Sequence, residues 1–144
     1  MYKKLKDLRK SKKGFTLVEL IVVLVILAIL AAILVPTLLG YIEKAKQKQV
    51  TTDASACLTA VQSLADEAYG AYNGTDTKTS AISATKVKDL TQITTSFSFS
   101  VTSWFGSDSA AKSYYQVKGF TFTENGYTAT WSNTDGSWKV AKKS

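Results

Sequence analysis

The first strong pattern along the chain is a long apolar run. Leu20–Val35 contains sixteen residues without one polar side chain, and the mostly apolar stretch Phe15–Val35 is 21 residues long. As an α-helix with a rise of about 1.5 Å per residue, this stretch reaches about 30 Å, which is the thickness of the hydrocarbon core of a bilayer. The pattern therefore predicts a helix that can span a membrane.

Beyond Pro36 the pattern becomes amphipathic, with apolar residues recurring at steps of mostly three and four. The apolar positions are Leu38, Ile42, Ala45, Val50, Ala54, Leu58, Val61, Ala65, Ala68 and Tyr72. The other side takes polar residues, including Glu43, Lys44, Lys46, Gln47, Lys48, Asp53, Gln62 and Asp66. We predict one helix over Thr16–Ala71. We expect no other part of the chain to pack on its first half, and the globular part to pack on one side of its second half. Gly70 and then Asn73-Gly74 end the helix.

The carboxy-terminal part changes to shorter elements. Residues Val87, Leu90 and Ile93 are spaced by three and predict a short helix over 85–92. Alternation and turn signals predict four strands, at Phe97–Val101, Tyr115–Thr123, Tyr127–Ser132 and Ser137–Ala141, with turns at 124–126 and 133–136. Three tryptophans and the other aromatic residues supply the apolar area that such a sheet needs. The predicted fold class is α+β, a long amino-terminal helix packed on a small antiparallel sheet.

Charge is concentrated at the amino terminus. The formal net charge is +7, of which seven Lys or Arg against one Asp place +6 within residues 1–14 and leave +1 for the rest. By the positive-inside rule, this basic end lies in the cytoplasm and the bulk of the chain projects outward. A nucleic-acid-binding surface protein is an alternative, but nucleic acid is an improbable partner for a nearly neutral chain whose only basic tail is Lys139, Lys142 and Lys143.

The residue types exclude several kinds of chemistry. With no His and only Cys57, the chain has no imidazole catalyst, no Cys/His zinc site and no internal disulfide. We expect Cys57 to be a small buried hydrophobe. Asp108, Glu124 and Asp135 are predicted in loops, where carboxylates can gather a calcium ion, but Asp is an ordinary turn former. We therefore predict no metal site, no cofactor and no enzymatic activity.

The basic and then apolar start allows three interpretations. A secretory signal peptide would end its apolar run in a small-residue cleavage site, whereas this run ends at Val35-Pro36 and helical patterning continues beyond it. A plain signal anchor fits the length and charge but gives no reason for Glu19 inside the apolar stretch. A carboxylate deep in a bilayer costs roughly 2.5–3.5 kcal/mol, so Glu19 either has a functional partner or stays hydrated near the interface.

The third interpretation rests on a resemblance. The run Lys12-Lys13-Gly14-Phe15-Thr16-Leu17-Val18-Glu19-Leu20, followed by apolar residues and Pro36, resembles the type III signal of type IV pilins and pseudopilins. The resemblance implies that a prepilin peptidase cuts after Gly14 and methylates the new amine of Phe15. It also implies that Glu19 pairs with the terminal amine of a neighbouring subunit during filament assembly.

Pro36 has two interpretations. Proline inside a helix removes a backbone hydrogen bond and kinks or breaks the helix, so Pro36 can simply mark the end of the membrane span. The resemblance instead places it in a curved region that can lose helical structure when subunits pack. Ala28 stands where many relatives carry a helix-weakening glycine, which argues against such melting here.

The resemblance also implies an organisation and a function. It divides the chain into a leader at 1–14, an assembly helix half at 15–36, an amphipathic helix half at 37–74 and a globular part at 75–144. The expected function is a structural pilin subunit that forms an extracellular homopolymer after a stage as a single-pass protein of the cytoplasmic membrane. A pseudopilin of a type II secretion or DNA-uptake system is the alternative. The implied partners are the prepilin peptidase, the assembly platform and the motor ATPase.

Overall fold

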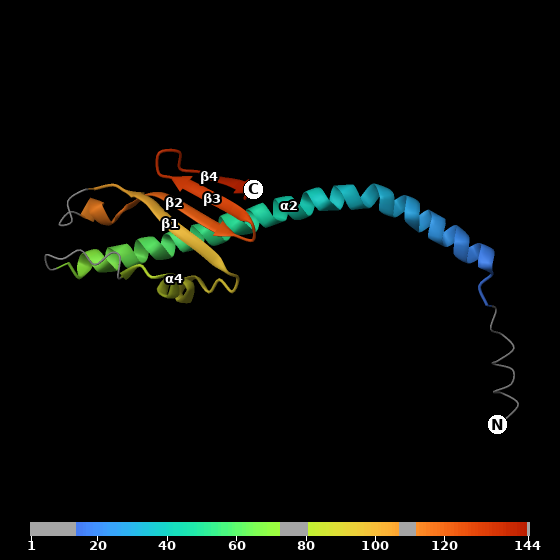
Figure 1. Ribbon diagram of the computed structural model, residues 1–144, viewed down its shortest axis with the longest axis horizontal. Helices are drawn as coiled ribbons and strands as arrows, with labels where there is room; N and C mark the ends of the chain where they lie inside the picture. The colour runs from blue at the N-terminus through green and yellow to red at the C-terminus, as the bar shows by residue number, and fades with distance from the viewer. Residues whose placement is uncertain (1–13, 73–80, 107–111, 144) are drawn as a thin grey trace, which may run out of the picture. The chain divides into compact units, whose positions relative to one another are not determined.

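A computed structural model describes residues 14–72, 81–106 and 112–143 (Figure 1). The elements in chain order are α2 (Leu17–Gly70), α4 (Ala84–Thr91), β1 (Phe97–Trp104), the 3-10 helix η1 (Lys112–Tyr115), β2 (Val117–Glu124), β3 (Tyr127–Ser132) and β4 (Trp138–Lys142). The chain divides into two compact units, Met1–Ile42 and Glu43–Ser144. The predicted α+β class, a long helix with a small antiparallel sheet, is confirmed.

Helix α2 agrees with the predicted helix to within one residue at each end. Gly70 is its last residue, as expected, whereas Asn73-Gly74 lies outside the described residues. Within Met1–Ile42, the helix is long and apolar enough to cross a membrane by length and composition. Every large apolar side chain from Phe15 to Ile42 keeps at least 42% of its surface exposed, so the described residues of this unit cover none of them.

Pro36 lies inside α2, and the helix continues on both sides of it. The Thr37 hydroxyl donates to the carbonyl oxygens of Ile33 at 3.2 Å and Leu34 at 2.9 Å. This is the usual back-bond of a helical threonine; the carbonyl that lacks its helical donor because Pro36 has no N–H is that of Ala32, four residues before it. The helix is unbroken between Ala28 and Pro36. Both interpretations of Pro36, the end of the membrane span and a loss of helical structure when subunits pack, stay predictions.

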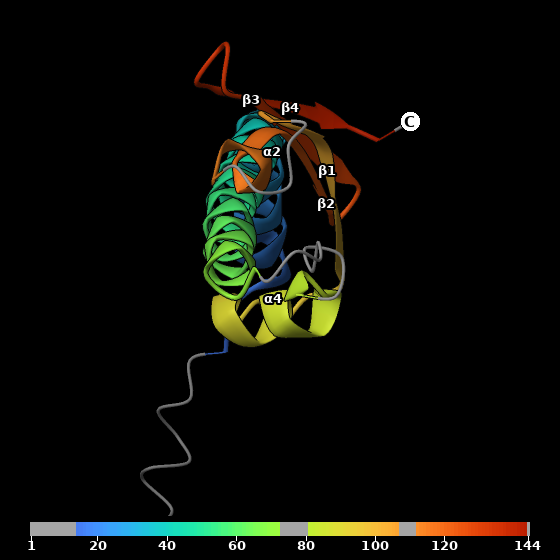
Figure 2. The same cartoon turned by 90° about the vertical axis from the view of Figure 1, so that its left-hand side faces the viewer.

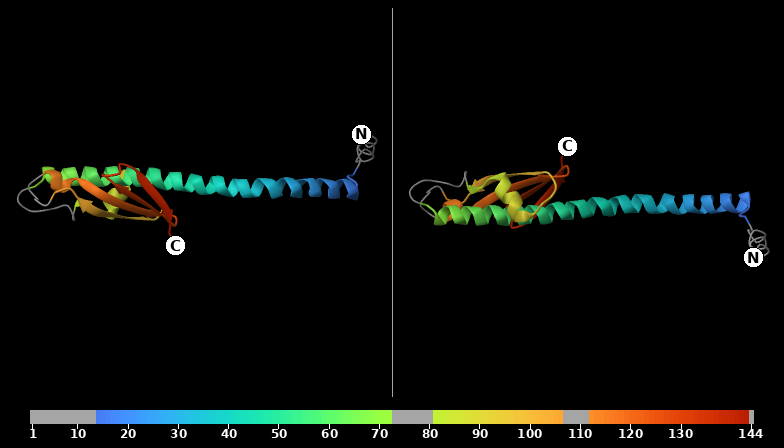
Figure 3. Two further views of the ribbon diagram at one scale, coloured as in Figure 1. Left: turned by 90° about the horizontal axis from the view of Figure 1, so that it is seen from above. Right: turned by 90° about the horizontal axis from the view of Figure 1, so that it is seen from below.

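The sheet of the Glu43–Ser144 unit is an antiparallel meander in the order β1-β2-β3-β4. In this unit the sheet lies against α2, and α4 packs near the β1 edge (Figure 2). Strand β3 matches the prediction, and β4 is shifted by one residue. Two strands differ from the prediction: β1 extends to Trp104, and β2 spans Val117–Glu124, so that Tyr115 belongs to η1 and Glu124 to the strand instead of the turn. The strands run obliquely to the axis of α2 (Figure 3).

Two glycines have conformational reasons to be glycine. Asn125 and Gly126 join β2 to β3 with φ angles of 49° and 77°, the pair of positive values that a type I′ hairpin turn requires. At Gly119, β1 and β2 meet at an irregularity in register. A Cβ on Gly119 would lie 2.8 Å from Ser103 Oγ and would also collide with the Thr102 hydroxyl, so these two side chains of β1 occupy space that a side chain at position 119 would need.

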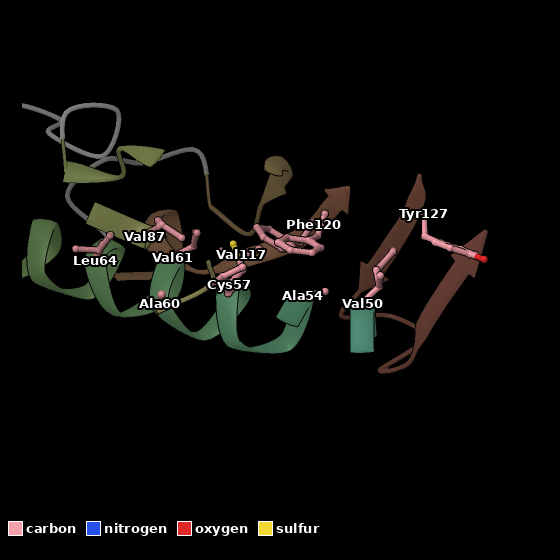
Figure 4. Close-up of a cluster of buried hydrophobic side chains, with 13 residues drawn as sticks. Val50, Ala54, Cys57, Ala60, Val61, Leu64, Val87, Val117, Phe120 and Tyr127 are labelled. Atoms are coloured by element: carbon pink, nitrogen blue, oxygen red, sulfur yellow. The ribbon is translucent and has the colours of Figure 1, made fainter. Parts of the chain in front are cut away.

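The core lies between the second half of α2 and the sheet (Figure 4). Small and β-branched residues of α2, among them Ala54 and Val61, face Phe120 and Phe122 of β2. The three tryptophans pack against this cluster while partly exposed. Cys57 is fully buried here, as expected, and burial raises the pKa of its thiol to about 12. The thiol is therefore protonated and inert near neutral pH.

The amphipathic pattern placed several helix residues wrongly. Leu38, Ile42 and Ala45 are exposed, because the buried stripe of α2 begins at Val50. Leu58 and Tyr72 are half-buried. Two residues assigned to the polar side instead face the sheet. They are Asp53, which contacts Glu124, and Gln62, which bonds to the backbone of Tyr115 and Val117.

The predicted short helix is α4, confirmed to within one residue at each end. Ser83 caps its start by accepting a hydrogen bond from the Lys86 N–H at 3.3 Å, and Gln92 ends it in the left-handed conformation. Val87 is its one buried residue and joins the core. This helix positions the segment 92–96, which leads into β1.

Candidate processing and assembly site

The predicted cleavage point, after Gly14, lies two residues before the first residue of α2. Gly14, Phe15 and Thr16 are exposed and precede the helix, whose first residue is Leu17. The Thr16 carbonyl accepts a hydrogen bond from the Leu20 N–H at 3.2 Å, which makes Thr16 the N-cap. Cleavage after Gly14 would therefore leave only Phe15 and Thr16 ahead of the apolar helix.

Thr16 and Glu19 form a reciprocal capping box. The Glu19 Oε2 atom accepts from the Thr16 N–H at 2.8 Å and from the Thr16 hydroxyl at 2.9 Å. In return, the Glu19 N–H donates to the Thr16 hydroxyl at 3.3 Å. The box satisfies backbone donors that the first helical turn would otherwise leave unpaired, and it places a negative charge at the positive end of the helix dipole.

Thr16 is a site residue that the sequence interpretation missed. Its signal was present, because Thr16-Leu17-Val18-Glu19 before an apolar run has the spacing of a capping box. The interpretation considered only a partner outside the chain, or water, for Glu19. Within the described residues, both bonds from Thr16 reach Oε2, so Oε1 remains open to a further donor.

The structure itself places no demand for glycine at position 14. A Cβ added at Gly14 would meet nothing within 4 Å among the described residues, and the backbone does not adopt a positive φ there. Any requirement for Gly14 must therefore come from a molecule that acts on this chain.

The fourth predicted site residue, Pro36, is separate from this group. It lies on the same helix seventeen residues after Glu19, which corresponds to about 25 Å along the helix axis. Gly14, Phe15 and Glu19 thus form one local site, and Pro36 does not contribute to it.

Of the three acidic residues considered for calcium, the two that the structure describes, Glu124 and Asp135, do not come together in a metal-binding group. Glu124 is not in a loop but is the buried last residue of β2, and Asp135 forms a 2.7 Å ion pair with Lys139. The bond to Asp135 also raises the pKa of Lys139. Asp108 lies outside the described residues. In the part of the chain that the structure describes, no group of three or more potential metal-ligating side chains is found.

The comparison with known families finds the prokaryotic N-terminal methylation motif at residues 9–35. This motif is the prepilin signal of type IV pilins and pseudopilins, so the resemblance seen in the sequence is confirmed. The match supports a protein of the type IV pilin or pseudopilin class, and together with the apolar helix it fits membrane anchoring. No curated protein and no solved structure matches the chain.

Proposed function

We propose that this chain is the structural subunit of a type IV pilus. In this proposal it is processed after Gly14, N-methylated at Phe15 and polymerised through its apolar helix into an extracellular filament. The observation that carries the proposal is the matched signal, which ends in a capped apolar helix whose large side chains are exposed from Phe15 to Ile42. Processing would expose this helix from its first turn. Assembly would then bury it against the same helix in other subunits.

Glu19 has a physical reason to pair between subunits. Cleavage creates a charged amine at Phe15, and a bundle of apolar helices offers no water to either this amine or the Glu19 carboxylate. Each charge is costly unless it is paired, and pairing between subunits also sets their axial register. Because Oε1 is open, Glu19 can accept a hydrogen bond from the terminal amine of a neighbouring subunit while Oε2 keeps its bonds to Thr16.

The remaining roles follow from the same proposal. A prepilin peptidase, an assembly platform and a motor ATPase act on the chain, first in the cytoplasmic membrane and then as it leaves for the cell surface. The subunit acts by assembling, with no enzymatic activity and no nucleic-acid partner. The absence of a nucleic-acid partner is supported by the small basic tail, because the charge of Lys139 is already paired with Asp135.

Substitutions at Glu19 and Thr16 separate charge pairing from helix capping. Gln at position 19 keeps the capping box but removes the charge, whereas Ala removes both. We expect Glu19→Gln and Glu19→Ala alike to give processed, membrane-inserted monomers that fail to enter filaments. Thr16→Ala keeps the carboxylate and should retain most filament yield, with a helix destabilised by about 1 kcal/mol. Filaments sheared from the host cells and electron microscopy measure the yield.

The outcomes discriminate between the interpretations. Normal filament yield from Glu19→Gln would contradict inter-subunit pairing. Loss of filaments from Thr16→Ala and Glu19→Ala, but not from Glu19→Gln, would assign Glu19 to capping alone. If wild-type cells carry no long surface fibres containing this subunit, the pseudopilin alternative replaces the pilus. A variant at an exposed acid on the same helix, Glu67→Gln, controls for the loss of one negative charge.

A further inference from the structure

A buried carboxyl group lies at the end of β2, in the Glu43–Ser144 unit. Glu124 is the last residue of β2 and keeps only 1% of its surface exposed. It continues the alternation of Phe120 and Phe122, whose side chains face α2 in the core. Glu124 therefore occupies a core-facing position, immediately before the Asn125-Gly126 turn.

The neighbours of Glu124 satisfy only one of its oxygens. The Thr95 hydroxyl donates a hydrogen bond to Oε1. Oε2 is buried and accepts no hydrogen bond from the described residues. Asp53, on α2, is a second acid close enough to the Glu124 carboxyl for its charge and side chain to raise the pKa of Glu124.

No cation offsets this second acid among the described groups around Glu124. On β1 its cross-strand partner is the apolar Phe97. On β3 its partner is Tyr127, whose hydroxyl donates to Glu43 Oε1 at 3.4 Å. Lys142 of β4 pairs in register with Tyr127 but is exposed, and the one ion pair found within the described ranges is Lys139 with Asp135.

Two carboxylates in contact cannot both stay ionised without a large electrostatic cost. A proton on one of them removes the repulsion and supplies the donor that the contact lacks. We propose that Glu124 holds a proton beside Asp53 and loses it as pH rises, so that this carboxyl pair fastens the end of β2 to α2 more firmly at acidic than at neutral pH. The pair would make the globular unit of the subunit responsive to the pH of its surroundings.

The raised pKa of Glu124 supports a pair that is more stabilising at acidic pH. Burial, the largest cause, raises its pKa above the ordinary value, the Thr95 hydrogen bond lowers it, and the charge and hydrogen bond of Asp53 raise it further. In the unfolded chain the pKa returns to about 4.3. Between these two values the folded state binds more protons, so stability falls as pH rises. The contribution is complete below the unfolded pKa and is lost as pH increases through the folded pKa.

A proton fits the pair better than a metal ion does. Calcium takes six to eight oxygen ligands, whereas the pair offers two carboxylates and the Thr95 hydroxyl, which already donates to Glu124. In the described ranges no third His, Cys, Asp or Glu joins them to form a metal-binding group.

The test is thermal unfolding of the full-length chain in detergent, followed by tryptophan fluorescence, since all three tryptophans lie in the Glu43–Ser144 unit. Gln at position 124 imitates the protonated acid at every pH. We expect Glu124→Gln to unfold about 4–8 °C above the wild type at pH 8 and at the same temperature at pH 4. Asp53→Asn should show the same pH-dependent gain, and the two gains should not add, because both relieve one repulsion.

Glu67→Gln, at an exposed position on α2, is the matched control and should leave the pH profile unchanged. A Glu124→Gln profile parallel to the wild type from pH 4 to pH 8 would overturn the proposal. So would a rise in the wild-type unfolding temperature at pH 8 on addition of calcium chloride that Glu124→Gln abolishes, because the pair would then hold a cation. Neither result bears on filament formation, so the inference stands or falls separately from the proposed function.

Discussion

At the scale of single residues, polar side chains fasten the helix to the sheet in a chain that has no disulfide. Gln62 is half-buried on α2 and reaches the start of β2. Its Nε2 donates to the Tyr115 carbonyl at 3.1 Å, and its Oε1 accepts from the Val117 N–H at 2.9 Å. One side chain thus bonds to two backbone groups at the start of β2, next to the point where the register between β1 and β2 is irregular.

Gln62→Ala should destabilise the globular unit by about 1–3 kcal/mol, because it removes the two hydrogen bonds from the helix to these backbone groups. Gln49→Ala removes the same side chain from an exposed position of the same helix and should change stability by less than about 0.5 kcal/mol. Urea unfolding of the full-length variants in detergent, followed by tryptophan fluorescence, measures both. Equal stability of the two variants would show that the Gln62 bonds contribute nothing.

At the scale of elements, the β2–β3 hairpin depends on the Asn125-Gly126 turn. Both residues have positive φ, which costs a side-chain-bearing residue about 1–2 kcal/mol. We expect Gly126→Val to destabilise the unit by at least this amount, as measured by urea unfolding. Gly70→Ala, at the end of α2 where a Cβ meets nothing, should be neutral or slightly stabilising. A neutral Gly126→Val would mean that the hairpin tolerates another turn.

Periodicity predicted the elements well because each has a local cause. The step of three and four residues follows from the helix, and the alternation of Tyr127–Ser132 follows from the strand, so both were placed nearly correctly. Side-chain partners were predicted less well. Asp53 and Gln62 looked like solvent-facing helix residues, because their partners lie more than fifty residues away in the chain and only the packed fold brings them together.

Some of the missed features had a local signal. Glu124 extends the alternation of Phe120 and Phe122 into a core-facing position. It was assigned to the turn because the turn signal Asn125-Gly126 follows it directly. Thr16 has the capping-box spacing to Glu19, but the membrane-spanning pattern concealed it. Charged and polar residues that continue a hydrophobic pattern are therefore informative, because they mark places where a buried partner is required.

At the scale of the whole molecule, the chain combines a helical segment whose apolar side chains are exposed, within Met1–Ile42, with a unit that has its own hydrophobic core, Glu43–Ser144. The core of Glu43–Ser144 comes from residues of α2 from Val50 onward together with α4 and the sheet. The substitutions predicted to weaken this core are all remote in sequence from Gly14–Glu19. Folding of the globular unit and processing of the amino terminus should therefore fail independently.

Gly14 tests this separation. A Cβ at position 14 meets nothing within 4 Å among the described residues, so Gly14→Val should not disturb folding, whereas a side chain at the cleavage point would crowd a peptidase. We expect Gly14→Val to keep its leader and migrate more slowly on a gel than the mature wild type, whose mass should correspond to a chain beginning at methylated Phe15. Its unfolding temperature should equal that of the unprocessed wild type.

Gly40→Ala is the matched control, because a Cβ there also meets nothing among the described residues, and this glycine lies within α2 beyond the matched signal. It should be processed like the wild type. Cleavage of Gly14→Val would show that the peptidase accepts a branched side chain, and the requirement for glycine would be lost. A difference between the unfolding temperatures of Gly14→Val and the unprocessed wild type would instead mean that the side chain at position 14 disturbs the folded unit, and the two ends of the chain would no longer be independent.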